Sequence, residues 1–275
     1  LSTSKRLMPR HEVTLGRRKF TWSRFDETWN AGLWQPRFLW DPLNQESVGL
    51  TGLFYRYRSK NWQFLTYFSP VSVPEQGSPV RVENGKIDSY NPLWRPLPEQ
   101  LSLTNTIVNL QYEIDEPSLE EILFRPSFGT QVRFGEEKGP WGSLGYGYLP
   151  IHQIQFAVDG FLDPAGDYFA FVKPQFLHRH LITVEGGVDS SFYRIWASLS
   201  GEIPEEDDVP DTYIFQPAGR ALITSTGAEF DIVPSVVLKA SYLRVDENQP
   251  AKKGLFRTEF ELPSRFAYRE AVSAG

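Results

Sequence analysis

The sequence contains no cysteine and a single methionine, Met8. Disulfide bonds therefore cannot stabilise this chain, which excludes the disulfide-rich class of secreted proteins and leaves both a cytosolic and an exported origin open. Positive charge is also scarce, since the formal net charge is −6 and no cluster of Lys and Arg alternates with aromatic residues. Nucleic acid is not an expected partner, because binding to phosphate groups needs a basic surface.

Long apolar runs and catalytic motifs are missing as well. No stretch approaches the roughly 18 consecutive apolar residues of a transmembrane helix. The first residues, LSTSKRLMPRH, lack the apolar core of a signal peptide, so an exported chain would be present here in its mature form. The HExxH, GxSxG and P-loop patterns do not occur, and we therefore predict no enzymatic activity and no cofactor.

Aromatic residues, in contrast, are abundant. The chain has 20 Phe, 12 Tyr and 8 Trp among 275 residues, and so many rings need a large apolar environment. The length allows one large all-β domain or two smaller domains. Because no linker rich in Gly, Ser or Pro separates two halves, and no internal repeat is visible, the sequence predicts a single domain over residues 1–275.

Apolar and polar residues alternate along much of the chain. In the segment 255–262, LFRTEFEL, the charged residues Arg257, Glu259 and Glu261 alternate with apolar or neutral ones. Segments 191–203 and 220–232 show the same period over more than ten residues. A period of two is typical of β-strands with two unlike faces.

Such segments predict about fourteen strands. Many of the connections are short and contain turn residues, which favours antiparallel neighbours. Three connections are long: 20–48, 70–103 and 203–218. If both chain ends lie on one side of a membrane, these long connections do not all fall on the same side, which suggests a missed or split strand between 115 and 180. The predicted strands cover residues 12–19, 49–58, 61–69, 104–114, 127–136, 142–149, 152–161, 167–174, 180–189, 191–202, 219–232, 235–246, 254–262 and 265–275.

Two environments could account for the unlike faces. In a soluble sandwich the apolar face packs against a second sheet and the polar face meets solvent. Strands of nine to thirteen residues are longer than is usual in soluble sheets and match the roughly 9–11 residues that cross a bilayer. The polar face carries Gly, Ser, Thr and Gln with isolated charges, which suits an enclosed aqueous interior, and aromatic residues lie near strand ends as in the girdles of membrane barrels.

The chain resembles the Gram-negative outer-membrane β-barrel superfamily, in its porin-like branch. The resemblance rests on the alternating segments, on GRRKFTWS after the first strand, and on FAYREAVSAG at the end. It implies a closed antiparallel transmembrane β-barrel of about 14 strands (12 to 16) with long loops on one side. It also implies a place in the outer membrane among lipid and lipopolysaccharide, passive passage of small polar solutes, and room for a homo-oligomer or an envelope-complex partner.

The expected site residues fall into two groups. The first lines the pore, where opposite charges would set selectivity or pair across the lumen. The second belongs to the long connection 20–48, which we expect to fold into the barrel mouth and narrow it. The predicted pore-lining residues are Arg56, Arg58, Arg133, Glu185, Arg194, Glu229, Lys239, Arg257 and Glu259, and the predicted constriction residues are Trp22, Asp26, Trp29, Trp34 and Arg37.

Other interpretations remain open. Connection 20–48 could plug the barrel completely, which would make the protein a structural subunit of an envelope complex. Its tryptophans could instead stack on sugars in a soluble carbohydrate-binding β-sandwich. His178 and His180 could share a metal, and the acidic run 205–208 could bind Ca²⁺, but neither shows a complete ligand pattern, so no metal site is predicted.

Overall fold

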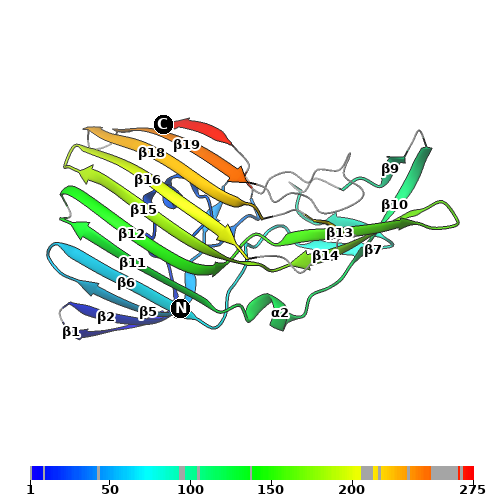
Figure 1. Cartoon of the computed structure of the whole chain (residues 1–275), viewed down its shortest axis with the longest axis horizontal. Coiled ribbons are helices and arrows are strands. Elements are labelled where there is room, and N and C mark those ends of the chain that lie inside the picture. Colours follow the sequence, from blue (N-terminus) through cyan, green and yellow to red (C-terminus); the bar gives the residue numbers. More distant parts are fainter. Residues whose placement is uncertain are drawn as a thin grey trace.

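The computed structural model describes the chain except residues 1, 9, 42–43, 93–96, 104–105, 137, 206–212, 216–217, 234–235, 249–265 and 267–268. The described part is all-β (Figure 1), as the alternation predicts. Two short helices accompany the strands: α1 (Arg24–Trp29) and α2 (Leu119–Leu123). The cap of α2 is a capping box between Ser118 and Glu121, which satisfies free N–H groups at its start.

The largest sheet, which we call the wall sheet, has eleven strands that all pair with antiparallel neighbours. In spatial order they are β1 (Ser2–Met8), β2 (His11–Arg18), β5 (Leu50–Arg58), β6 (Trp62–Ser69), β11 (Ser127–Gly135), β12 (Gly139–Pro150), β15 (His178–Asp189), β16 (Tyr193–Pro204), β18 (Arg220–Val233), β19 (Val236–Asn248) and β20 (Glu270–Ala274).

Long and short connections of the wall sheet lie at opposite ends. The strand pairs β1–β2, β5–β6, β11–β12, β15–β16 and β18–β19 are joined by only two or three residues at one end. At the other end lie the strand ends that flank the long connections 19–49, 70–126, 151–177, 205–219 and 249–269. The prediction that long loops gather on one side agrees with this arrangement (Figure 1).

A second sheet extends from the long-connection end (Figure 1). It consists of β17 (Ile214–Phe215), β13 (Gln155–Leu162), β14 (Tyr168–Gln175), β10 (Thr106–Ile114) and β9 (Gln100–Leu103), and β10 pairs with β14 in parallel. Two small hairpins complete the described strands: β3 (Arg37–Phe38) with β4 (Glu46–Ser47), and β7 (Val80–Glu83) with β8 (Lys86–Ser89).

The second sheet corrects the predicted strand count. The predicted strands 104–114, 152–161 and 167–174 correspond to β10, β13 and β14, which pair within the second sheet and not with the wall. The prediction of a missed or split strand between 115 and 180 was therefore wrong: strands β11 to β14 in that range were all predicted, and three predicted strands do not belong to the wall. The predicted strand 254–262 lies outside the described residues, and the described part has seven strands that were not predicted: β1, β3, β4, β7, β8, β9 and β17.

The wall sheet has two edges in the part of the chain that the structure describes. Its edge strands are β1 and β20, and no pairing joins them. The described sheet is thus open, and the predicted closure of about 14 strands into a barrel is not seen in it. Strand alternation reports which face of a strand is apolar, but it carries no information on which strands are neighbours at the two edges.

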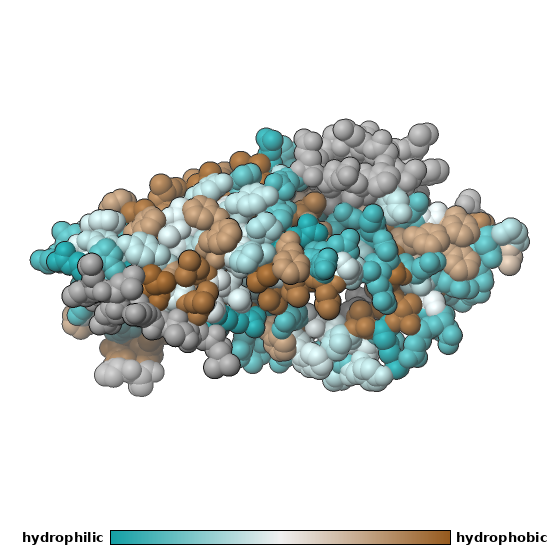
Figure 2. All heavy atoms as spheres, turned by 90° about the horizontal axis from the view of Figure 1, so that it is seen from below, coloured by the Kyte–Doolittle hydropathy of each residue, from teal (hydrophilic) through white to brown (hydrophobic). Residues whose placement is uncertain are grey.

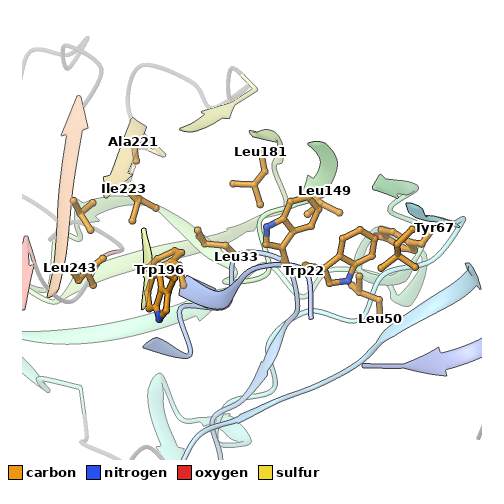
Figure 3. Close-up of a cluster of buried hydrophobic side chains, with 14 of the residues drawn as sticks. Trp22, Leu33, Leu50, Tyr67, Leu149, Leu181, Trp196, Ala221, Ile223 and Leu243 are labelled. Atoms are coloured by element: carbon orange, nitrogen blue, oxygen red, sulfur yellow. The ribbon is translucent and has the colours of Figure 1, made fainter. Parts of the chain in front are cut away.

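The core lies between one face of the wall sheet and the connection 19–49, which we call the insert. Trp22, Phe25, Leu33 and Trp34 of the insert pack with residues that come from wall strands β5, β6, β12, β15, β16, β18 and β19. Figure 3 shows Trp22 and Leu33 among these side chains. We call the sheet face under the insert the inner face and the opposite one the outer face.

Candidate functional site

The two faces of the wall strands differ in an unusual way. In β16, the outward residues Ile195 and Leu199 are 47% and 45% exposed. The inward residues Ser198, Ser200 and Glu202 are at most 4% exposed. Soluble proteins usually bury their apolar residues and expose their polar ones, so this strand has the opposite distribution.

The same distribution continues across the sheet. Figure 2 shows hydrophobic residues at the surface of the wall-sheet half of the molecule. In β18, Leu222, Phe230 and Ile232 lie on the outer face, and all three are exposed. Many exposed apolar residues on one face of neighbouring strands mark a site of contact with a partner or a membrane. The exposed apolar residues of the outer face include Leu15, Leu53, Phe68, Phe128, Leu144, Ile182, Val184, Leu222, Phe230 and Tyr242.

Two stacked tryptophans join the insert to the inner face. The rings of Trp22 and Trp34 are nearly parallel, with centroids 4.9 Å apart, and Tyr67 of β6 meets Trp22 edge-on. The indole N–H of Trp34 donates to Thr183 of β15, and that of Trp29 donates to Ser225 of β18. The insert is therefore held to β15 and β18 by hydrogen bonds as well as by ring packing.

Glycines form the floor under Trp34. A Cβ placed on Gly145 would lie 3.0 Å from Cζ2 of this ring, one on Gly147 3.0 Å from Cζ3, and one on Gly129 3.4 Å from Cζ3. Adjacent strands β11 and β12 thus lack side chains where the indole lies.

We expect Gly145→Val to lower the free energy of unfolding by about 1–3 kcal/mol, because its side chain would displace the Trp34 ring from its packed position. Urea unfolding in detergent micelles, followed by tryptophan fluorescence, measures this loss. Gly201→Val is the matched control, since Gly201 lies on the outer face of β16 and a Cβ there meets no atom within 4 Å. Equal stability of the two variants would contradict the floor role of Gly145.

Glu185 of β15 holds the start of α1. Its carboxylate accepts hydrogen bonds from the Ser23 hydroxyl at 2.5 Å and from the backbone N–H groups of Arg24 and Phe25 at 3.0 and 3.3 Å. Ser23 is also the N-cap of α1 and accepts from the N–H of Asp26. A buried carboxylate on the wall therefore compensates the free N–H groups at this helix end.

Asp26 closes the insert on itself. Its two carboxylate oxygens accept from the backbone N–H groups of Leu33 and Trp34 at 2.9 and 2.8 Å. Burial raises the pKa of this carboxyl above its usual range, and the two backbone hydrogen bonds oppose that shift. Asp26 thus fixes the turn that places the Trp34 ring against Gly129, Gly145 and Gly147.

A buried ion pair lies at the long-connection end of the inner face. Arg179 of β15 donates to Glu202 of β16 at 2.9 Å, and both side chains are at most 1% exposed. The same guanidinium donates to the carbonyl of Leu33 at 2.5 Å. The pair therefore joins two wall strands to the insert.

His152, in the connection after β12, is fully buried beside this pair. Burial and, to a smaller extent, the nearby Arg179 charge lower the pKa of His152 to about 3. The folded state then keeps this imidazole neutral down to about pH 3, whereas the unfolded chain takes up a proton near pH 6.5.

Because the unfolded state binds more protons in this window, stability should fall as the pH drops below 6.5, by up to about 1.4 kcal/mol per pH unit. Urea unfolding at pH 7 and pH 5.5 measures the slope, and His152→Gln should make it shallower. An unchanged slope in His152→Gln would show that other groups cause the acid sensitivity.

A cavity of about 360 Å³ lies between the insert and the inner face. Its lining carries six cationic side chains but only one carboxylate, that of Glu185. The cationic residues are Arg18 of β2, Lys19 and Arg24 of the insert, Arg56 and Arg58 of β5, and Arg133 of β11.

Two carboxylates next to the cavity are each shared by two of these arginines. Glu12 of β2 pairs with Arg18 at 2.7 Å and with Arg56. Asp189 of β15 pairs with Arg24 at 2.8 Å and with Arg133 at 3.3 Å. Together with Glu185, three carboxylates lie in or beside a cavity that six cationic side chains line.

The predicted pore-lining residues fall into three sets. Arg56, Arg58, Arg133 and Glu185 all line the cavity. Arg194, Glu229 and Lys239 lie on the inner face near the short connections, where Glu229 pairs with both cations. Arg257 and Glu259 lie outside the described residues.

The predicted constriction residues do not all lie in the same place: four pack against the inner face, and Arg37 does not. Trp22, Asp26 and Trp34 are buried and Trp29 is partly buried against the inner face. Arg37 instead points to Glu75, with which it pairs at 2.5 Å, and does not line the cavity. Sequence reasoning missed Arg24, Asp189 and Arg179, although Arg179 lies two residues from the inward Leu181 and so shares its face.

The described residues contain no group of three or more His, Asp or Glu side chains that could hold a metal ion. His178 and His180 do lie on one face of β15, but the former contacts the Pro126 carbonyl and the latter the Tyr146 hydroxyl. Most of the acidic run 205–208 lies outside the described part of the chain. Among the helices that are described, none is long and apolar enough to cross a membrane.

No protein-family model matches the chain, and no curated protein matches it. Among solved structures, the chain is similar to outer-membrane expressed OmpT of Vibrio cholerae, with 9% sequence identity and a TM-score of 0.33. The alignment covers 88% of this chain and 68% of that one.

Proposed function

We propose that the wall sheet is part of a transmembrane β-barrel in the outer membrane of a Gram-negative bacterium, and that the barrel is a porin-like channel for small polar solutes. The observation that carries this proposal is the distribution of residues on the wall strands: apolar side chains are exposed on the outer face, and polar side chains are buried on the inner face. Hydrocarbon is the environment in which such an outer face is stable.

The dimensions of the wall support the same proposal. Strands β12, β15 and β16 have 12 residues each, enough to cross a bilayer when tilted. In lipid, unpaired backbone groups at the sheet edges would cost several kcal/mol each. The proposal therefore includes closure of the two edges in the membrane, with lipid and lipopolysaccharide around the outer face.

The cavity under the insert supports passage through the interior. Charged and polar side chains form most of its lining, it lies on the inner face, and about 360 Å³ beside the insert stays unfilled. Charged side chains around a narrow aqueous passage are the usual determinants of which solutes pass.

A plugged structural barrel is the second candidate. It is favoured by the packing of the insert, where Trp22, Phe25, Leu33 and Trp34 are all at most 2% exposed. An insert held this firmly could block the interior entirely, and the protein would then serve an envelope complex as a scaffold.

Membrane placement can be tested with nitroxide labels in reconstituted lipid vesicles. Labels at Thr226 and Ala228 on the outer face should collide often with oxygen and rarely with a water-soluble nickel chelate. A label at Ser241, on the inner face, is the matched control and should show less contact with lipid. Outer-face labels that are fully accessible to the nickel chelate would contradict the membrane proposal.

Planar bilayers separate the channel from the plugged scaffold. A channel should give stepwise conductance, and Asp26→Ala should increase it, because the turn that seats Trp34 loses its carboxylate acceptor. Protein that inserts but conducts in neither form would contradict the channel and favour the scaffold.

A further inference from the structure

The arginine-lined cavity has more positive charge than its own carboxylates neutralise. Each of the two shared carboxylates, Glu12 and Asp189, serves two guanidinium groups, and Glu185 is engaged with the start of α1. Lys19 is a further cation of the lining. A concave site with one sign of charge and low-dielectric walls concentrates ions of the opposite sign.

The kind of cation points to a particular kind of anion. Five of the six cations are arginines, whose planar groups donate two parallel hydrogen bonds to a carboxylate or phosphate. The buried Nε of Arg56 has no hydrogen-bond partner among the described residues. Arg133 is further held in place above the Trp141 ring, with its guanidinium carbon 4.3 Å from the ring centroid, so its orientation is fixed before any solute arrives.

We propose that this cavity is a binding site for small oxyanions with two or more negative charges, such as inorganic phosphate or a short dicarboxylate. The inference rests on the proposed function only for its biological meaning, because anion binding can be measured whether or not the barrel conducts. In a channel, the site would concentrate such solutes at the narrow zone between the insert and strands β5 and β11.

Binding is tested on the full chain folded in uncharged detergent. Inorganic phosphate should raise the thermal unfolding midpoint above that in KCl of equal ionic strength, and succinate in a parallel series tells phosphate recognition from general dicarboxylate binding. The test variant is Arg58→Gln combined with Arg133→Gln. Lys239→Gln is the control, since Lys239 is a cation on the same face that does not line the cavity.

The site is supported if phosphate or succinate protects the wild type and Lys239→Gln but protects the double variant much less. It is overturned if neither anion exceeds KCl, or if all three proteins are protected equally. In bilayers under a KCl gradient, each removed charge should lower the anion preference about twofold, as expected for a unit charge about 8 Å away in water. Anion protection without any conductance would refute the channel while retaining the site.

Discussion

Replacing Arg179 with methionine is expected to lower the free energy of unfolding by about 3–5 kcal/mol, because it leaves the Glu202 carboxylate buried without its counter-ion. The substitution also removes the donor to the Leu33 carbonyl, so the insert should loosen from the wall. Urea unfolding in detergent micelles, followed by tryptophan fluorescence, reports both effects, since Trp22 and Trp34 lie in the same packed region.

The matched control for this variant is Arg244→Met. Arg244 pairs with Asp246 at 2.9 Å, but both side chains are about half exposed, and exposed pairs contribute about 0–1 kcal/mol. The double variant Arg179→Met, Glu202→Leu should recover much of the loss, because no uncompensated charge remains. If Arg179→Met costs no more than Arg244→Met, the pair does not join the insert to the wall.

The second large effect is expected from placing a charged residue on the outer face of the wall sheet. Leu199 lies in the middle of β16, on the outer face, and is 45% exposed. In water, replacing a half-exposed leucine usually changes stability by less than about 0.5 kcal/mol. In a bilayer, an arginine near the midplane costs about 2–4 kcal/mol. We therefore expect Leu199→Arg to reduce both insertion into lipid vesicles and stability once inserted.

Leu162→Arg is the control variant that distinguishes a position facing lipid from a position facing water. Leu162 is a strand residue of β13, is 53% exposed, and belongs to the second sheet beyond the long-connection end of the wall. Its replacement should leave the vesicle-inserted fraction unchanged. Equal behaviour of the two variants would mean that the outer face of β16 is not in hydrocarbon.

The faces of the wall strands were predictable from the sequence because alternation determines them directly. The period of two in segment 191–203 places Ser198, Ser200 and Glu202 on one face of the strand, and all three are inward and buried. The same signal failed for residues 152–161 and 167–174, which are genuine strands that belong to the second sheet. Period-two patterning identifies a strand but not its neighbour, so membership of one sheet or the other could not be derived from it.

The site was only partly predictable for a related reason. Arg56, Arg58, Arg133 and Glu185 were expected on an aqueous interior because they stand on polar faces of predicted strands. Their surroundings depend on the insert, whose path is determined by specific contacts such as Asp26 with the Leu33 and Trp34 amides. Single positions like Arg24 and His152 therefore gave no signal that they would lie beside a cavity or be buried.

The separation of short and long connections in the wall sheet affects how such a protein could enter a membrane. The end with two or three residues per connection exposes few polar backbone groups, so moving it through hydrocarbon costs comparatively little. The opposite end carries the insert, the second sheet and their many charges, and cannot follow it across. If the wall sheet enters a membrane as proposed, its final orientation would therefore be determined by the compartment from which insertion starts.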